Sequence, residues 1–369
     1  MKKVHIFIGS LEKFQTKVPD DARNLTDVVM ELDKDAKSFT IQLPNSTPPE
    51  KEPLNVTNFV IYSNEYSGVR EHVVLNFANF LAQMDIEEMY LQNPPLRIID
   101  QIEHIYSEIV EYEYEQYPSV TADTLRMINS EYPKEIIGQD DVKNNILSSI
   151  YPLLNQDNKK PVVMLFYGAS GVGKTETAQF IARIMKGKLL RRQFSMYQNN
   201  EFATYLFGGS LYQGSFARDL LDRESNVILL DEFDKANPVF HSAFYQLFDE
   251  GVYEDQNYTV NVEKAIIICT SNYSSKQEIK DKLGEAIYNR FDAVIGFKTL
   301  NKQSKDILID KYISEYPNDI MSEDQITALK NGALKCDNAR SIKRLIQDAF
   351  SLVNVRKILA DKPTKSEIE

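Results

Sequence analysis

The stretch Gly168-Ala169-Ser170-Gly171-Val172-Gly173-Lys174-Thr175 decides the fold of this chain. An apolar run at residues 161–167 precedes it, and residues 176–185 follow it with apolar side chains at helical spacing. A strand, a glycine loop and a helix in this order are the context of a phosphate-binding P-loop. The glycines let backbone N–H groups face a polyphosphate, and the helix N-terminus and Lys174 add positive charge. Because the Thr175 hydroxyl can bind Mg²⁺, the chain is predicted to bind a nucleotide with Mg²⁺.

Downstream of this loop, two apolar strands are predicted to end in polar residues. Residues 227–230 lead into Asp231 and Glu232, which is typical of a Walker B motif about 55 residues after a P-loop. Asp231 is expected to hold the Mg²⁺ shell near Thr175, and Glu232 to polarise the attacking water as general base. Residues 265–270 deliver Asn272 to the same sheet edge, where its amide can orient the water or contact the γ-phosphate.

Three more motifs flank these elements in order: Ile137-Gly-Gln, Asn289-Arg290-Phe-Asp and Asn338-Ala-Arg340-Ser-Ile-Lys-Arg. The whole series resembles the AAA+ module of the Clp-type unfoldases, and most of all their second, C-terminal ATPase module. The resemblance covers residues 135–360 and implies an α/β large domain with a parallel sheet and a helical lid. It also implies a homo-oligomeric ring, usually hexameric, with ATP at the subunit boundaries.

The resemblance assigns roles motif by motif. Arg290 matches the arginine finger that reaches a neighbouring subunit's γ-phosphate, and Arg340 matches the sensor 2 arginine of the lid; an arginine fork suits the charge of a transferring phosphoryl group. The expected catalytic residues are Glu232, Asn272, Arg290 and Arg340, and the expected metal ligands are Thr175 and Asp231. The residues expected to bind ATP are Ile137, Gly168, Ser170, Gly171, Val172, Gly173, Lys174, Thr175 and Glu176.

The sequence divides into four predicted regions. These are an N-terminal α/β domain (1–117), a linker (118–135), a large ATPase domain (136–297) and a helical lid with a polar tail (298–369). The first region carries no motif with a known chemistry, and we expect an unrelated small domain that recognises a protein partner. Its predicted strands are 4–8, 39–43 and 59–62, and its predicted helices are 72–90 and 96–114. The predicted lid helices are 301–315, 322–335 and 339–360.

Composition restricts the class of protein. Of the 369 residues, 43% are hydrophobic and 26% charged, with a formal net charge of −12, which is ordinary for a globular chain. The acidic balance disfavours nucleic acid and anionic membranes as partners, although the basic run at residues 186–192 leaves a nucleic-acid motor as an open alternative. Cys269 and Cys336 are interpreted as reduced structural residues. Residues 1–9 lack a signal-peptide core and no apolar run is long enough to span a membrane, so a cytoplasmic location is expected.

Two departures from the family pattern bear on function. Residues 206–216 correspond to the pore loop of the family but are several residues shorter than that loop. Two interpretations of Tyr212 stay open: it grips a peptide in a channel, or it packs at a subunit boundary. The triplet Ile295-Gly296-Phe297 resembles a peptidase-docking loop, but its position aligns with the last core strand, and no peptidase docking is expected. The leading hypothesis is ATP hydrolysis that remodels a protein partner. The alternative hypothesis is a nucleotide-gated assembly switch with little or no threading.

Overall fold

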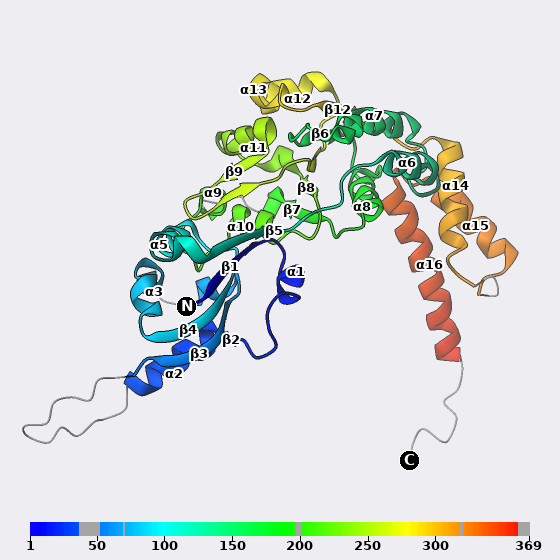
Figure 1. Ribbon diagram of the computed structural model, residues 1–369. Coiled ribbons are helices and arrows are strands. Elements are labelled where there is room, and N and C mark those ends of the chain that lie inside the picture. Colours follow the sequence, from blue (N-terminus) through cyan, green and yellow to red (C-terminus); the bar gives the residue numbers. More distant parts are fainter. Residues whose placement is uncertain (37–51, 69–70, 197–200, 318–319, 361–369) are drawn as a thin grey trace, which may run out of the picture.

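The computed structural model describes residues 1–36, 52–68, 71–196, 201–317 and 320–360 (Figure 1). Two parallel sheets follow one another along the chain, and a group of helices completes it. The N-terminal sheet and the C-terminal helices lie on opposite sides of the central sheet.

The N-terminal domain is built on a five-stranded parallel sheet in the order β2-β3-β4-β1-β5. Alternate residues of β1 face opposite sides: Val4 and Ile6 pack in the main core of the domain, while Phe7 packs against Phe14 of α1. The strands are β1 (Lys3–Ile8), β2 (Arg23–Asn24), β3 (Leu54–Ile61), β4 (Met84–Gln92) and β5 (Val110–Tyr114). The α-helices are α1 (Leu11–Gln15), α2 (Leu25–Ala36), α3 (Glu71–Leu75), α4 (Phe77–Leu81) and α5 (Leu96–Tyr106).

Two helix predictions in this domain are wrong. Residues 72–90 form two short helices and then β4, and residues 96–114 form α5 and then β5. In β4, Met84 and Ile86 are buried while Asp85 and Glu87 are exposed, which is the period of two of a strand rather than the period of a helix. The Glu and Tyr residues of β5 also alternate with a period of two, and β5 is the edge strand beside β1. The strand predicted at 39–43 lies outside the described residues.

Residues 118–135, predicted as a linker, contain the helix α6 (Ala122–Glu135). It begins with a capping box between Thr121 and Thr124, and Pro133 lies in its last turn. Ile128 and Tyr132 are completely buried in the core of the following domain, and the Tyr132 hydroxyl lies 3.2 Å from Thr177 Oγ1. The helix is therefore a packed part of the following domain rather than a linker.

The central domain holds the second five-stranded parallel sheet, in the order β12-β6-β11-β8-β7. Its strands are β6 (Val162–Tyr167), β7 (Leu190–Gln193), β8 (Val227–Asp231), β11 (Ile266–Ser271) and β12 (Ala293–Gly296), with a hairpin of β9 (Val252–Glu254) and β10 (Thr259–Asn261) beside it. Its α-helices are α7 (Asp140–Ile150), α8 (Lys174–Ile184), α9 (Glu201–Phe207), α10 (Phe216–Leu221), α11 (Tyr245–Glu250), α12 (Lys276–Leu283) and α13 (Glu285–Tyr288). The prediction that residues 295–297 belong to the last core strand is confirmed as far as Gly296, where β12 ends beside β6.

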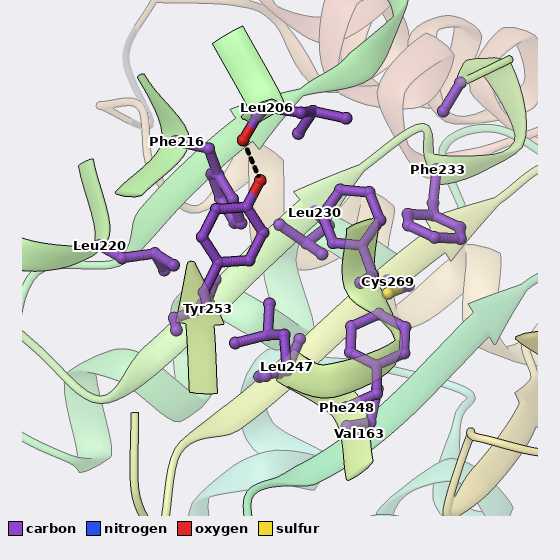
Figure 2. Packing of buried hydrophobic residues seen from close by; sticks show 14 of the residues in the cluster. Val163, Leu206, Phe216, Leu220, Leu230, Phe233, Leu247, Phe248, Tyr253 and Cys269 are labelled. Atoms are coloured by element: carbon purple, nitrogen blue, oxygen red, sulfur yellow. Dashed lines mark hydrogen bonds between the residues drawn. The ribbon is translucent and has the colours of Figure 1, made fainter. Parts of the chain in front are cut away.

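Both faces of this sheet are covered. On one face, Leu230 and Cys269 pack with an aromatic cluster that includes Phe233 and Tyr253, whose hydroxyl donates to the Leu206 carbonyl over 2.6 Å (Figure 2). On the other face, alternate strand residues such as Leu229 pack against α6, α7 and α8. A sheet buried on both faces fixes its strand ends rigidly, and those ends carry the candidate site.

The C-terminal helices agree with the predicted lid. They are α14 (Lys302–Ile313), α15 (Glu323–Ala333) and α16 (Ala339–Ala360). They share a core of their own, centred on Leu308, Ile342, Ile346 and Phe350. Among the described residues, no helix has the length and apolar character needed to cross a membrane.

Candidate functional site

The P-loop connects the end of β6 to the start of α8. Gly168, Gly171 and Gly173 have φ values of 135°, 74° and 106°, which residues other than glycine adopt only with strain. At Gly168 a Cβ would also lie 2.6 Å from the carbonyl oxygen of Phe297, just after β12. The loop therefore needs glycine at these positions, and the chain wraps closely around the space that a phosphate would occupy.

Lys174, the first residue of α8, points its ammonium group into this loop. Nζ donates to the carbonyls of Gly168 (2.6 Å) and Ala169 (2.8 Å) and to Asn272 Oδ1 (3.2 Å). Burial lowers the pKa of Lys174 to about 8, against the opposing attraction of Asp234 and Asp231. Two residues predicted to act together, Lys174 and Asn272, are thus in direct contact.

The two Walker B carboxylates lie at the end of β8 and are held by β11. The Thr270 hydroxyl donates to Asp231 Oδ1 over 2.5 Å and accepts the Glu232 backbone N–H over 2.8 Å. Glu232 has a φ of 55°, an uncommon conformation for a side chain of this size. Gln193, at the end of β7, donates to Glu232 Oε2 over 3.2 Å. Thr270 therefore holds both residues in place, and the Glu232 carboxylate has a further partner of its own in Gln193.

Arg191 of β7 makes an ion pair with Asp231. Its Nε and one terminal nitrogen both donate to Asp231 Oδ2, at 2.9 and 2.5 Å. With Thr270 on Oδ1, both oxygens of the buried Asp231 carboxylate accept hydrogen bonds. A cation binding at Asp231 would have to share the carboxylate with Arg191 or displace it.

Asp234 brings a third carboxylate to the site. Its side chain is 3% exposed, its Oδ1 has no hydrogen-bond partner, and it is the strongest attraction acting on the Lys174 ammonium. Mg²⁺ prefers oxygen ligands and usually takes only one or two carboxylates together with substrate phosphates and water. Thr175, Asp231 and Asp234 fit that donor set, whereas no group of His, Cys, Asp and Glu in the described ranges forms a metal cage by itself.

The lid closes the other side of the P-loop. The Ala339 N–H, at the start of α16, donates to the Gly171 carbonyl over 3.2 Å, and a Cβ on Gly171 would lie 2.8 Å from Asn338 Oδ1. A cavity of about 310 Å³ opens here between the large domain and the lid. Among the residues that line it are Ile137, Val172, Gly173, Glu176, Tyr312 and Arg340. The structure thus brings Arg340, Ile137 and Glu176 together beside the P-loop.

Gln139 ties the segment before the P-loop to this arrangement. It is 2% exposed, and its side-chain amide donates to the carbonyls of Val172 (3.2 Å) and Lys298 (2.7 Å) while accepting the Lys298 N–H (3.1 Å). It therefore joins the loop to the segment that enters the lid.

Arg290 lies away from these residues. Nε donates to Asp249 over 2.8 Å, one terminal nitrogen donates to the Ala286 carbonyl over 2.7 Å, and the guanidinium stacks over the Tyr245 ring at 4.0 Å. These contacts are with α11 and α13 rather than with the P-loop of the same chain.

The shortened pore segment is anchored near its N-terminal end. The Gln256 N–H donates to the Phe207 carbonyl (3.0 Å), and the Asn257 side chain donates to the Gly209 carbonyl (2.8 Å). Leu211 packs against the cores of both the central and the N-terminal domains. Tyr212 itself is 72% exposed. Its side chain is thus available for contact, although the backbone beside it is held.

Sequence reasoning did not identify Gln139, Arg191, Gln193, Asp234 or Thr270 as site residues. Asp234 and Thr270 stand inside motifs that were used, two residues after Glu232 and two before Asn272. Arg191 and Gln193 lie on a short strand without a recognisable motif. Their proximity to Asp231 and Glu232 depends on the pairing of β7 with β8.

Comparison with known proteins agrees with this geometry. The family described as "AAA domain (Cdc48 subfamily)" matches residues 159–318. A chaperone protein ClpB of Mycoplasmoides gallisepticum is 26% identical over 284 residues, covering 67% of this chain and 40% of that protein. ClpB 2 of Nostoc sp. is 30% identical over 230 residues, with 53% and 26% covered, and a ClpA homolog protein of Fuscovulum blasticum is 27% identical over 242 residues, with 58% and 30% covered. The chain spans well under half the length of these relatives.

Proposed function

Because the chain carries a Clp-like AAA+ ATPase module, we propose that it hydrolyses ATP with Mg²⁺ at sites shared between the subunits of a ring. The observation that carries the proposal is the convergence of Lys174, Asn272 and the Walker B pair on one glycine loop, with the lid residue Arg340 beside it. We propose a hexamer, the usual ring of the family that the chain resembles.

Each residue has a role that follows from its position. The loop amides and Lys174 bind the phosphates, and the Thr175 hydroxyl and Asp231 hold the metal side of the nucleotide. Bound Mg²⁺ would supply positive charge to the β- and γ-phosphate oxygens. Glu232 accepts the proton of the attacking water, and Asn272 orients that water against the γ-phosphate.

Two arginines complete the proposal. Arg340 contacts the phosphates from the lid of the same chain, so that hydrolysis changes the angle between lid and large domain. Arg290 acts in the neighbouring subunit, where it neutralises charge on the transferring phosphoryl group. Its position supports this, because its guanidinium contacts α11 and α13 rather than its own P-loop. To act in trans it must leave Asp249, which is 47% exposed and gains water in exchange.

The work done by hydrolysis is proposed to be remodelling of a protein partner, which the N-terminal domain selects. We draw this from the two ClpB relatives, which are named as chaperones, and from the presence of a separate folded domain before the ATPase. The exposed Tyr212 side chain would contact the partner.

A second candidate is a nucleotide-gated assembly switch that threads no polypeptide. The observation that favours it is Leu211, which packs between two cores and leaves the pore segment little freedom to move. In this case ATP binding would assemble the ring and hydrolysis would release it.

Two variants separate these candidates. A remodelling enzyme should lose partner processing on Tyr212→Ala while its ATPase rate stays within about twofold, because the exposed ring touches no site residue. A switch should tolerate Tyr212→Ala but remain assembled with its partner on Glu232→Gln, which binds ATP without hydrolysing it. Met196→Ala is a matched control, because Met196 is also a large apolar side chain and is 78% exposed. The proposal of an ATPase fails if Glu232→Gln hydrolyses ATP at the wild-type rate.

A further inference from the structure

The two sheets of this chain have the same strand order. Numbered along the chain within each five-stranded sheet, the strands run 2-3-4-1-5 in the N-terminal sheet and in the ATPase sheet, and all neighbours are parallel. Nothing in the sequence motifs suggested this relationship, because the N-terminal domain has no glycine-rich phosphate loop.

The register agrees residue by residue beside the first strand. Ile8 and Tyr167, which end the first strand of each sheet, pair with the last residue of the fifth strand, Tyr114 and Gly296 respectively. In both sheets the residue that follows the fifth strand donates its N–H to the last carbonyl of the first strand. Glu115 donates to the Ile8 carbonyl and Phe297 to the Tyr167 carbonyl, each over 2.8 Å. A glycine follows the first strand in both domains.

This register shows what stands in place of the nucleotide site. In the N-terminal sheet Ile61 pairs with Leu91, and at the equivalent place in the ATPase sheet Leu230 pairs with Cys269. The next two residues of the N-terminal strand, Tyr62 and Ser63, therefore stand where the ATPase sheet has Asp231 and Glu232. Only residues 9 and 10 separate β1 from α1, whereas residues 168–173 separate β6 from α8. At this edge, the described residues of the N-terminal domain therefore offer neither a loop long enough to surround a phosphate nor a pair of carboxylates.

The corresponding edge of the N-terminal sheet is filled by the ATPase domain. Asp222, which follows α10, accepts hydrogen bonds at Oδ1 from Asn93 (2.8 Å) and Gln92 (3.2 Å) and at Oδ2 from Ser63 (3.5 Å). Gln92 and Asn93 lie where the ATPase sheet has Thr270 and Ser271. A carboxylate from one domain thus sits at the strand ends where the other domain holds its catalytic residues.

The next residue strengthens the same joint. Arg223 is 7% exposed and stacks its guanidinium on the Tyr117 ring at 4.4 Å, while the Tyr117 hydroxyl donates to the Arg223 carbonyl over 3.0 Å. Four residues later β8 begins at Val227, and it ends at Asp231, the first Walker B carboxylate. The joint is therefore connected to the candidate site by one strand, β8, and Figure 1 shows α10 beside the N-terminal domain.

We propose that the N-terminal domain is a nucleotide-free counterpart of the ATPase sheet, and that its strand edge is a docking site for Asp222. In the ATPase sheet this edge binds the nucleotide, whereas in the N-terminal sheet the equivalent edge binds the ATPase domain. The N-terminal domain is then a fixed partner of β8 rather than a freely tethered module, and a protein bound to it is mechanically coupled to the Walker B strand.

Hydrogen exchange of the full chain without nucleotide tests the docking. In Asp222→Ala, the amides at residues 61–64 and 91–94 should exchange about tenfold faster or more, because three hydrogen bonds across the domain joint are lost. The Gln92 and Asn93 side chains then keep only the Gly9 carbonyl of their own domain as acceptor. Asp222→Asn keeps an acceptor oxygen and should protect these segments at least as well as the wild type does. Glu224→Ala is the matched control in the same loop, since Glu224 pairs with the exposed Lys188.

Exchange in Asp222→Ala equal to that of the wild type would overturn the docking, as would the same acceleration in Glu224→Ala. If Asp222→Ala does not fold, Gln92→Glu is the second variant. It keeps the shape of Gln92 but opposes a carboxylate to Asp222, and it should open the same segments. Because no nucleotide is present, these outcomes are independent of the proposed ATPase reaction.

The number of nucleotides bound per chain tests the second part of the proposal, that the N-terminal edge binds no nucleotide. Equilibrium dialysis of Glu232→Gln with ATP and Mg²⁺ should give one nucleotide per chain, and adding Lys174→Ala should remove it completely. A second nucleotide per chain, or one that survives Lys174→Ala, would overturn the proposal that the N-terminal edge binds none.

Discussion

Asn272 accepts a hydrogen bond from the Lys174 ammonium over 3.2 Å, and this contact links the end of β11 to the first turn of α8. The ammonium also donates to two loop carbonyls, so it is held by three acceptors before any phosphate arrives. A bound phosphate replaces some of these partners. The Lys174 and Asn272 side chains are therefore preorganised at the place where charge is expected to develop.

Lys174 should make ATP binding pH-dependent. Burial lowers the pKa of Lys174 to about 8, so the ammonium loses its proton in the free protein as the pH rises above 8, while bound polyphosphate favours the charged form. Above pH 8 ATP binding should therefore take up a proton, and affinity should fall by up to about tenfold per pH unit. Calorimetry of Glu232→Gln at pH 9 in buffers of different ionisation enthalpy measures the uptake. An affinity that stays constant from pH 7 to 9.5 would contradict the assignment.

Thr270→Val should impair hydrolysis more than binding. The Thr270 hydroxyl bonds to Asp231 and to the Glu232 backbone, and valine has the same shape without the hydroxyl. We expect kcat to fall about 10²-fold, with ATP affinity within about threefold of the wild type. Thr270→Ser, which keeps the hydroxyl, is the control and should recover most of the rate. A loss of affinity as large as the loss of kcat would show that Thr270 only supports the local fold.

Arg191→Ala should alter the response to Mg²⁺. The guanidinium donates twice to Asp231 Oδ2, so its removal frees that oxygen for the metal side of the nucleotide. We expect half-maximal ATPase activity at about two- to fivefold lower Mg²⁺, and a nucleotide-free protein less stable by about 1 kcal/mol, because the pair is partly exposed. Lys188→Ala is the control. An Arg191→Ala protein that binds ATP with Mg²⁺ but is inactive would contradict competition and indicate a direct catalytic role.

Asp222 should make the stability of the chain depend on pH. Burial raises the pKa of Asp222 from 3.8 to about 6. Between these values the folded protein binds a proton that the unfolded chain does not, so this group stabilises the fold as the pH falls from 6 to 4, and its charge destabilises the fold above pH 6. Asp222→Asn should therefore be more stable than the wild type by about 1–3 kcal/mol at pH 7.5 and nearly equal to it at pH 4. Denaturant unfolding at both pH values measures this, and an equal difference at both would contradict it.

The sequence predicted those parts of the fold whose pattern is local. The P-loop, the Walker B strand and the three lid helices follow from apolar periodicity and glycine spacing, and the structure places them as expected. In contrast, β4 and β5 were mistaken for helix, because apolar and charged residues in short mixed elements satisfy both periods. Residues 118–135 were predicted as a linker, but they contain α6, whose last turn includes Pro133.

The contacts that sequence patterns did not predict depend on pairing between distant strands. Arg191 reaches Asp231 only because β7 lies beside β8, and Asp222 reaches Asn93 only because two domains dock. Neither contact can be recognised as a sequence motif, because each joins single polar side chains that are 40 or more residues apart in the sequence. The matching strand order of the two sheets is likewise a property of topology and is invisible to spacing.

The most direct test of a shared ATPase site is the effect of Arg290→Ala on activity and assembly. ATPase rate and molar mass by light scattering are measured together across protein concentration, for the wild type, Arg290→Ala and the exposed control Arg126→Ala. We predict that the rate per chain rises as the wild type and Arg126→Ala assemble, and that Arg290→Ala binds ATP but is slower by about 10³-fold or more. A monomer that hydrolyses ATP at the full rate without Arg290 would contradict the account.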